Sequence, residues 1–163
     1  MSARDIIAIC QRHLPLHPDN CSGFVRAVAS DCGVLLVGDA NALVDQLRWT
    51  GRILLDGPAA ARAAGNGDLV LGGAKAPGNG HVVVIVAGPL NRGKYPYAFW
   101  GQYHAIALAG MSTNVGFTRG HGTVNWAFKP PTLDSLTYAA FSPLELLMPR
   151  AGPNEGLVVH TFT

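Results

Sequence analysis

The pattern of apolar residues changes at Gly65-Asn66-Gly67, and this change limits the folds that the chain can adopt. Before these residues, apolar side chains recur at helical spacing, and after them short β-branched runs alternate with glycine-rich turns. Helices that precede strands in this way are typical of an α+β domain. We therefore expect N-terminal helices packed on an antiparallel β-sheet.

Four segments are predicted to be helices from their apolar spacing, and three of them begin with an N-cap residue or a proline. They are residues 3–14, a segment from Asp19-Asn20 to Gly33, a segment that begins after Asp39, and a segment from Pro58, taken as the first helical residue, to Gly65. Strands are expected at residues 68–71, 81–87, 95–109, 124–128, 136–141 and 157–162, with loops at 72–80 and 88–94.

Length and composition are those of one folded domain that covers residues 1–163. Hydrophobic residues make up 48% of the chain, which argues against disorder. No segment has the ~18–20 consecutive apolar residues of a membrane-spanning helix, and the N-terminus lacks the apolar run of a signal peptide. The net charge of +2 is too small and too scattered for a nucleic-acid-binding surface. Neither nucleic acid nor a membrane is therefore expected as a partner.

Cys21 is the residue that most strongly indicates chemistry, because it lies in the first turn of the second predicted helix. The positive end of a helix dipole lowers the pKa of a thiol, and the N–H groups of the first turn can stabilise an oxyanion. Asn20 precedes the thiol, and the small residues Ser22 and Gly23 leave room for a substrate backbone beside it. One short segment thus supplies a nucleophile, its activation and an oxyanion hole.

A free cysteine is more often a small buried hydrophobic residue than a nucleophile. Cys10 and Cys32 fit this alternative, because each lies in an apolar helical pattern, whereas Cys21 has polar and small neighbours. A disulfide between Cys10 and Cys32 is left open, since three cysteines leave at least one thiol unpaired. The sequence has no closely spaced set of Cys and His ligands, so neither a metal nor another cofactor is expected.

His81 is the candidate base, because it begins a buried strand directly after a glycine-rich loop. A third group should orient its imidazole, as in other catalytic triads. Residues 100, 102 and 104 share one face of the expected strand, so Gln102 or His104 could orient the ring while Trp100 walls the pocket. An ordinary role in the sheet is the alternative for each of the three. His121 is interpreted as a solvated loop residue.

Two motifs resemble those of the NlpC/P60 cysteine peptidases, which have a papain-like fold. Asp19-Asn20-Cys21-Ser22-Gly23-Phe24-Val25 is similar to the D-C-S-G-F-V motif of that family with one residue inserted, and Gly80-His81-Val82 is similar to its Gly-His-Val strand. Their separation of about 60 residues also suits the family. Other segments, within roughly residues 5–142, resemble the first family of type VI secretion amidase effectors; these are Asn41-Ala42-Leu43-Val44-Asp45, Gly88-Pro89-Leu90 and Lys94-Tyr95-Pro96.

The resemblance implies a peptidoglycan amidase, a cysteine endopeptidase that hydrolyses the γ-D-glutamyl–meso-diaminopimelic acid bond of the peptide stem with Cys21 and His81. It further implies that the protein is made in the cytoplasm without a signal peptide and is delivered by the type VI secretion apparatus to the periplasm of a target cell. A periplasmic immunity protein would protect the producing cell. Two alternatives stay open: a housekeeping or phage-derived cell-wall endopeptidase, and a catalytically inactive wall-binding module.

The third catalytic residue departs from the family pattern. Many NlpC/P60 enzymes place a polar residue, often His, shortly after the base, whereas His104 lies 23 residues after His81. In the effector subgroup the corresponding position aligns with Trp100, which cannot orient an imidazole through a carboxylate or an amide. A backbone carbonyl is therefore a further candidate for this role, and the tail at residues 143–163 has no counterpart in the family.

Overall fold

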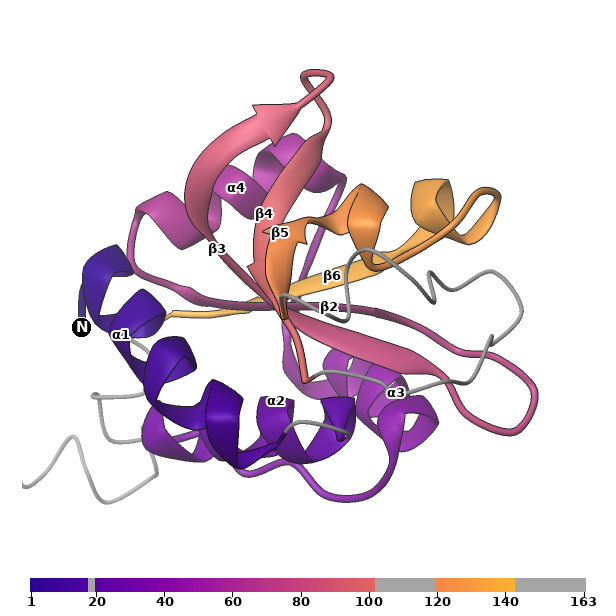
Figure 1. Ribbon diagram of the computed structural model, residues 1–163, viewed down its shortest axis with the longest axis horizontal. Helices are drawn as coiled ribbons and strands as arrows, with labels where there is room; N and C mark the ends of the chain where they lie inside the picture. Colours follow the sequence, from indigo (N-terminus) through magenta and orange to yellow (C-terminus); the bar gives the residue numbers. More distant parts are fainter. Residues whose placement is uncertain (18–19, 102–119, 143–163) are drawn as a thin grey trace, which may run out of the picture.

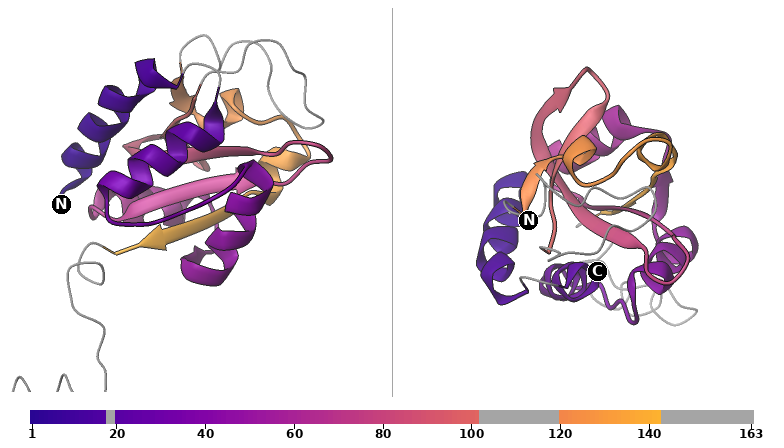
Figure 2. Two further views of the ribbon diagram at one scale, coloured as in Figure 1. Left: turned by 90° about the horizontal axis from the view of Figure 1, so that it is seen from below. Right: turned by 45° about the vertical axis from the view of Figure 1, so that its right-hand side comes forward.

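The computed structural model describes residues 1–17, 20–101 and 120–142. In this part of the chain a six-stranded antiparallel sheet lies between two helical layers (Figure 1, Figure 2). The strand order is β1-β6-β2-β3-β4-β5. The α+β class and the antiparallel sheet expected from the sequence are thus confirmed.

The bounds of the elements follow from N to C terminus. The helices are α1 (Ala3–His13), α2 (Cys21–Asp31), α3 (Ala40–Thr50) and α4 (Gly57–Gly65), with the 3₁₀ helices η1 (Leu14–Leu16), η2 (Val124–Trp126) and η3 (Thr132–Ser135). The strands are β1 (Arg52–Leu54), β2 (Leu69–Ala74), β3 (His81–Asn91), β4 (Tyr95–Phe99), β5 (His121–Thr123) and β6 (Thr137–Phe141). The described ranges contain no helix with the length and apolarity that a bilayer span requires.

Side-chain caps explain where the helices begin, because they satisfy N–H groups that have no partner within the helix. Asn20 and Asp39 cap α2 and α3 as predicted, and each accepts a hydrogen bond from the N–H three residues further on, at 2.8 and 2.9 Å. Asp56 caps α4 in the same way. Gly57 is therefore the first residue of α4, and the prediction that Pro58 holds this position was wrong by one residue.

The two faces of the sheet carry separate hydrophobic cores. Val82, Val84 and Val86 of β3 belong to the core formed with α1, α2 and α3, which lie together on one side of the sheet in Figure 1. Val83 and Ile85 belong to the core formed with α4 and the segment around η2. Residues 81–86 of β3 are therefore buried on both faces, which explains why the sequence shows an unbroken β-branched run there instead of an alternating pattern.

Strand β2 is longer than predicted, because Gly72 and Gly73 belong to it and not to a loop at residues 72–80. A Cβ on Gly72 would lie 3.2 Å from the ring of Tyr138, and one on Gly73 would lie 2.8 Å from the side chain of Val82. Glycine at these two positions permits close packing within the sheet. A sequence pattern cannot distinguish this requirement from the glycine of a turn.

Strand β3 also exceeds its predicted range, because it continues to Asn91 through the segment 88–94 that we expected to be a connection. The register against β4 shifts between Val86 and Asn91, which marks a bulge. Arg92 and Gly93, with φ angles of 54° and 69°, then turn the chain into β4. The two strands form a long hairpin that projects beyond the rest of the sheet (Figure 1).

The second half of the chain contains the largest errors of the sequence prediction. The strand expected at residues 124–128 is instead the 3₁₀ helix η2, closed by a hydrogen bond from the Ala127 N–H to the Val124 carbonyl at 3.0 Å. Strand β5 precedes it and was missed, as was the edge strand β1. Each has three residues, too few to show a period of two. Residues 102–109 of the strand predicted at 95–109, and all of the strand predicted at 157–162, lie outside the described residues.

Candidate active site

Cys21 is the first residue of α2, as predicted, and only 2% of its surface is exposed. The side-chain oxygen of Asn20 accepts hydrogen bonds from the Gly23 N–H at 2.8 Å and from the Ser22 hydroxyl at 3.0 Å. Because the Gly23 N–H donates to the cap, it cannot also hold an oxyanion without breaking that bond. The oxyanion donors at this helix start are therefore to be sought at the N–H groups of Cys21 and Ser22.

Gly101, at the end of β4, brings the sheet into direct contact with the start of α2. A Cβ on Gly101 would lie 2.5 Å from the Asn20 carbonyl oxygen and 3.0 Å from the Cα of Cys21. These distances are too short for any side chain, so the backbones of Gly101 and Asn20 touch. The position of Cys21 relative to the sheet is thus fixed by a residue that has no side chain and was not singled out in the sequence.

We expect Gly101→Ala to destabilise the fold by roughly 1–3 kcal/mol, because the added Cβ meets backbone atoms that cannot rotate away. Urea denaturation of the variant measures this loss. Gly65→Ala is the matched control, since a Cβ at Gly65, the last residue of α4, meets no atom within 4 Å. Equal stability of the two variants would contradict the close contact between β4 and α2.

His81 is the first residue of β3 and is buried, with 6% of its surface exposed. Its ring packs on the ring of Phe128, with 5.0 Å between the two centroids and an angle of 52° between their planes. Burial lowers the pKa of His81 from 6.5 to about 4, because desolvation disfavours the charged imidazolium. The imidazole is therefore neutral at neutral pH, which is the form that a general base requires.

Cys21 and His81 lie at the same end of the sheet. Strands β3 and β4 are antiparallel, so the start of β3 and the end of β4 are neighbours. Continuing the pairing of Val84 with Phe99 by two residues brings Gly101 opposite Val82, the residue next to His81. Gly101 in turn contacts the backbone at Cys21, so the predicted nucleophile and base share one neighbourhood of the fold.

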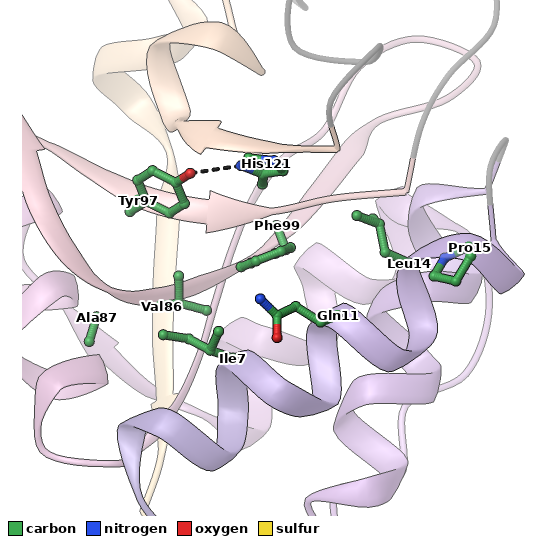
Figure 3. A pocket seen from close by; sticks show the side chains of 9 residues that line it. All are labelled: Ile7, Gln11, Leu14, Pro15, Val86, Ala87, Tyr97, Phe99 and His121. Carbon is green, nitrogen blue, oxygen red and sulfur yellow. Dashed lines mark hydrogen bonds between the residues drawn. The ribbon is translucent and has the colours of Figure 1, made fainter.

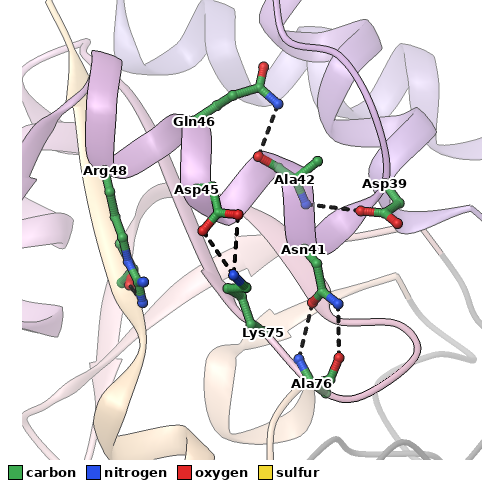
Figure 4. Close-up of polar contacts among 9 residues, drawn as sticks. Asp39, Asn41, Ala42, Asp45, Gln46, Arg48, Lys75 and Ala76 are labelled. Carbon is green, nitrogen blue, oxygen red and sulfur yellow. Dashed lines mark hydrogen bonds and ion pairs between the residues drawn. The ribbon is translucent and has the colours of Figure 1, made fainter.

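The loop that leads to His81 is held by α3 (Figure 4). The side chain of Asn41 accepts a hydrogen bond from the Ala76 N–H at 3.1 Å and donates one to the Ala76 carbonyl at 2.9 Å, as a neighbouring strand would. Lys75 adds an ion pair with Asp45, at 3.0 Å. This clamp precedes His81 by five residues and fixes the path of the chain into β3, so Asn41 acts as a positioning residue for the strand that carries the candidate base.

The structure answers the remaining site predictions only in part. Trp100 is 1% exposed and packs in the core on the α4 side of the sheet, so its indole fills the core and does not wall an open pocket. Gln102 and His104, the candidates for orienting the imidazole, lie outside the described residues, as does Asp19. The identity of the third catalytic residue therefore stays a prediction.

His121 does not lie in a solvated loop, contrary to the sequence interpretation. It is half-buried in β5, and its Nδ1 is hydrogen-bonded to the hydroxyl of Tyr97 at 2.7 Å. Its ring also lies 5.5 Å from that of Phe99, measured between centroids. The glycines on either side of His121 concealed the strand, because they indicate a turn when read from sequence alone.

The other groups that can bind protons or metals have structural roles. Cys10 and Cys32 are buried thiols and form no disulfide, although the sequence left one open. Burial raises the pKa of both, that of Cys32 to about 11. In the described part of the chain, no three His, Cys, Asp or Glu residues are grouped so that they could hold a metal ion. The chemistry of the described residues therefore centres on Cys21 and His81.

Comparison with known proteins gives the relationship of the chain. No family model matches it. Peptidoglycan amidase Tse1 of Pseudomonas aeruginosa (strain PAO1) is 40% identical over 134 residues, which cover 82% of this chain and 82% of the relative. Identity of this degree across most of both chains shows common descent. The chain therefore belongs to the family of the peptidoglycan amidase Tse1.

Proposed function

We propose that this protein is a peptidoglycan amidase that cleaves the peptide stem, with Cys21 as nucleophile and His81 as general base. The observation that carries this proposal is the 40% identity to a peptidoglycan amidase, in a chain whose Cys21 begins a capped helix next to the strand of His81. The bond cleaved would be the one between the γ-carboxyl of D-glutamate and meso-diaminopimelic acid.

The reaction would proceed in two steps. His81 takes the proton of the Cys21 thiol, and the thiolate attacks the γ-carbonyl carbon to form a tetrahedral intermediate. The N–H groups at the start of α2 stabilise the oxyanion, and the intermediate collapses to a thioester as His81 protonates the leaving amine. Water, activated by His81, then hydrolyses the thioester and restores the thiol.

The approach of the two groups is constrained by the sheet. Cys21 belongs to the core on the α1–α3 side, whereas the ring of His81 packs on Phe128, which belongs to the core on the α4 side. The catalytic pair must therefore meet around the end of β3, where the two faces of the sheet come together. This requirement is consistent with His81 being the first residue of its strand.

The wider biological role follows the same proposal. The antiparallel sheet, with a helix that begins at the nucleophile, would be a papain-like NlpC/P60 fold, and the chain 1–163 would act as one catalytic domain. The protein would be an antibacterial effector that the type VI apparatus delivers to the target periplasm. A periplasmic immunity protein would bind it in the producing cell.

The proposed reaction is tested by incubating the purified protein with stem-bearing muropeptides and identifying the fragments by mass spectrometry. The expected products are one fragment that ends in D-glutamate and one that begins with the freed amine of diaminopimelic acid. New termini at another bond would correct the proposed specificity, and uncleaved muropeptides would refute the activity.

A live nucleophile should also differ from the two other thiols in its reactivity. We expect iodoacetamide at pH 7 to alkylate Cys21 at least about tenfold faster than Cys10 and Cys32, whose pKa values are raised by burial in the apolar core. Peptide mapping of the alkylated protein after increasing times measures the three rates. Equally slow alkylation of all three would favour the inactive wall-binding module.

A further inference from the structure

A pocket of about 590 Å³ lies between α1 and the edge of the sheet formed by β4 and β5 (Figure 3). Its walls are the apolar side chains of Leu14 and Pro15 on one side and three rings, those of Tyr97, Phe99 and His121, on the other. Its volume lies within the range of small-molecule sites, about 300–1,000 Å³. The mechanism proposed above makes no use of it.

The three rings form one platform. Phe99 lies between the other two, with centroid distances of 6.4 Å to Tyr97 and 5.5 Å to His121. The planes of Phe99 and His121 differ by 36°, and those of Tyr97 and His121 by 31°, so these faces have similar orientations. Such a surface suits a flat ligand whose C–H groups can lie against aromatic faces.

Polar groups border this platform at defined positions. The bond between the Tyr97 hydroxyl and Nδ1 of His121 holds that imidazole in place and does not use its Nε2. Figure 3 shows the amide of Gln11, which provides both a donor and an acceptor, across from the rings. The site thus combines an aromatic floor with hydrogen-bonding groups at its rim.

The charges of the pocket exclude most of the peptide stem as its ligand. None of the described residues that line it is an acidic or basic residue other than His121, which is counted as neutral at pH 7. The carboxylates and the ammonium group of a stem would find no partner of opposite charge there. A neutral ligand with an apolar face and several hydroxyl or amide groups fits better, and a sugar ring has these properties.

The distance from Cys21 also suits a sugar. Residues 97, 99 and 101 of β4 project to the same face, and Gly101 contacts the backbone at Cys21. Phe99 is two residues from Gly101, about 7 Å along the strand. The stem places two amino acids between its sugar and the proposed scissile bond, and these span at most about 7 Å. A sugar would therefore reach the rings while the scissile carbonyl lies at the sulfur.

We propose that this pocket binds an N-acetylated hexosamine of the glycan strand, so that the enzyme prefers stems still attached to glycan over free peptides. The proposal rests on the proposed function, because it places the scissile bond at Cys21. The sugar ring lies against Tyr97, Phe99 and His121, and its acetamido and hydroxyl groups bond to Gln11 and to His121.

Binding to a catalytically inactive protein tests the sugar site separately from the reaction. The Cys21→Ala protein is titrated calorimetrically with a stem peptide and with the same peptide attached to its N-acetylglucosaminyl–N-acetylmuramyl disaccharide. We expect the disaccharide to tighten binding about tenfold. Adding Gln11→Trp, at an exposed helix position where the indole fills the pocket, should reduce the ratio of the two affinities to near one. Ser30→Trp, on the exposed surface of α2 and outside the pocket, should preserve the ratio.

The outcomes separate the two proposals. Equal affinities for the two ligands in the Cys21→Ala protein would overturn the sugar site, and so would a preference that survives Gln11→Trp. A preference that Gln11→Trp removes and Ser30→Trp preserves would support the sugar site. If the unmodified protein then left muropeptides uncleaved, the proposed reaction would fail while the sugar site remained.

Discussion

Replacing Cys21 by alanine is expected to reduce kcat/KM for muropeptide cleavage by about 10⁴-fold or more, since without its sulfur no thioester can form. The fold should survive, because alanine is compatible with the first turn of α2 and the Asn20 cap does not involve the Cys21 side chain. Product formation by liquid chromatography and the urea midpoint of the variant measure the two effects. Full activity in the variant would eliminate Cys21 as the nucleophile.

Cys32→Ala is the matched control for this experiment. Cys32 follows the last residue of the same helix, is buried, and contributes its thiol only to packing. Its removal should lower the urea midpoint while kcat/KM stays near that of the unmodified protein. A comparable loss of activity in both variants would indicate that the fold of α2, and not the sulfur of Cys21, accounts for the effect.

Replacing His81 by glutamine is expected to reduce kcat/KM by about 10³-fold or more, because the amide cannot take the thiol proton. Glutamine is uncharged at every pH, so it also removes a titration from the folded state. Muropeptide assays of this variant over a range of pH measure the loss. Retention of most activity would show that another group serves as the base.

The acid limb of the pH profile reports the environment of the same imidazole. Burial lowers the pKa of His81 to about 4, so the base stays neutral and kcat/KM should change little between pH 7 and pH 5. An imidazole with an ordinary pKa would lose about 30-fold over this interval. Stability responds in the same direction: the unfolded chain binds the proton more tightly, so stability is complete above pH 6.5 and is lost as the pH falls towards 4.

The loss amounts to as much as about 3 kcal/mol for a shift of this size in a buried group. The difference in unfolding free energy between the unmodified protein and His81→Gln isolates it, because His17, whose pKa is also lowered, is present in both. A pH-independent difference between the two proteins from pH 6.5 to 4 would mean that the folded protein does not disfavour the imidazolium.

The sequence predicted the parts of the site that depend on local chemistry. A polar residue before a helical period defines an N-cap, and this was enough to place Cys21 at the first turn of α2. The β-branched run after His81 likewise defined a strand buried on both faces. Both inferences use interactions between residues close in sequence, which a single chain displays directly.

The parts that the sequence did not predict depend on contacts between distant segments. Gly101 fixes the start of α2 against β4, and Gly73 packs beneath Val82, yet both resemble turn residues until the partner backbone is known. His121 was interpreted as solvated because its bond to Tyr97 joins residues 24 positions apart. A pattern search over neighbouring residues contains no trace of such pairs.

The burial of β3 on both faces sets the direction from which a substrate can arrive. With helices above and below the strand, no part of the stem can lie flat across the sheet to reach the ring of His81. The carbonyl must come end-on, in line with the strand, at the point where the polypeptide enters it. Such a geometry favours slender, unbranched stems over stems whose cross-bridges thicken the chain beside the scissile bond.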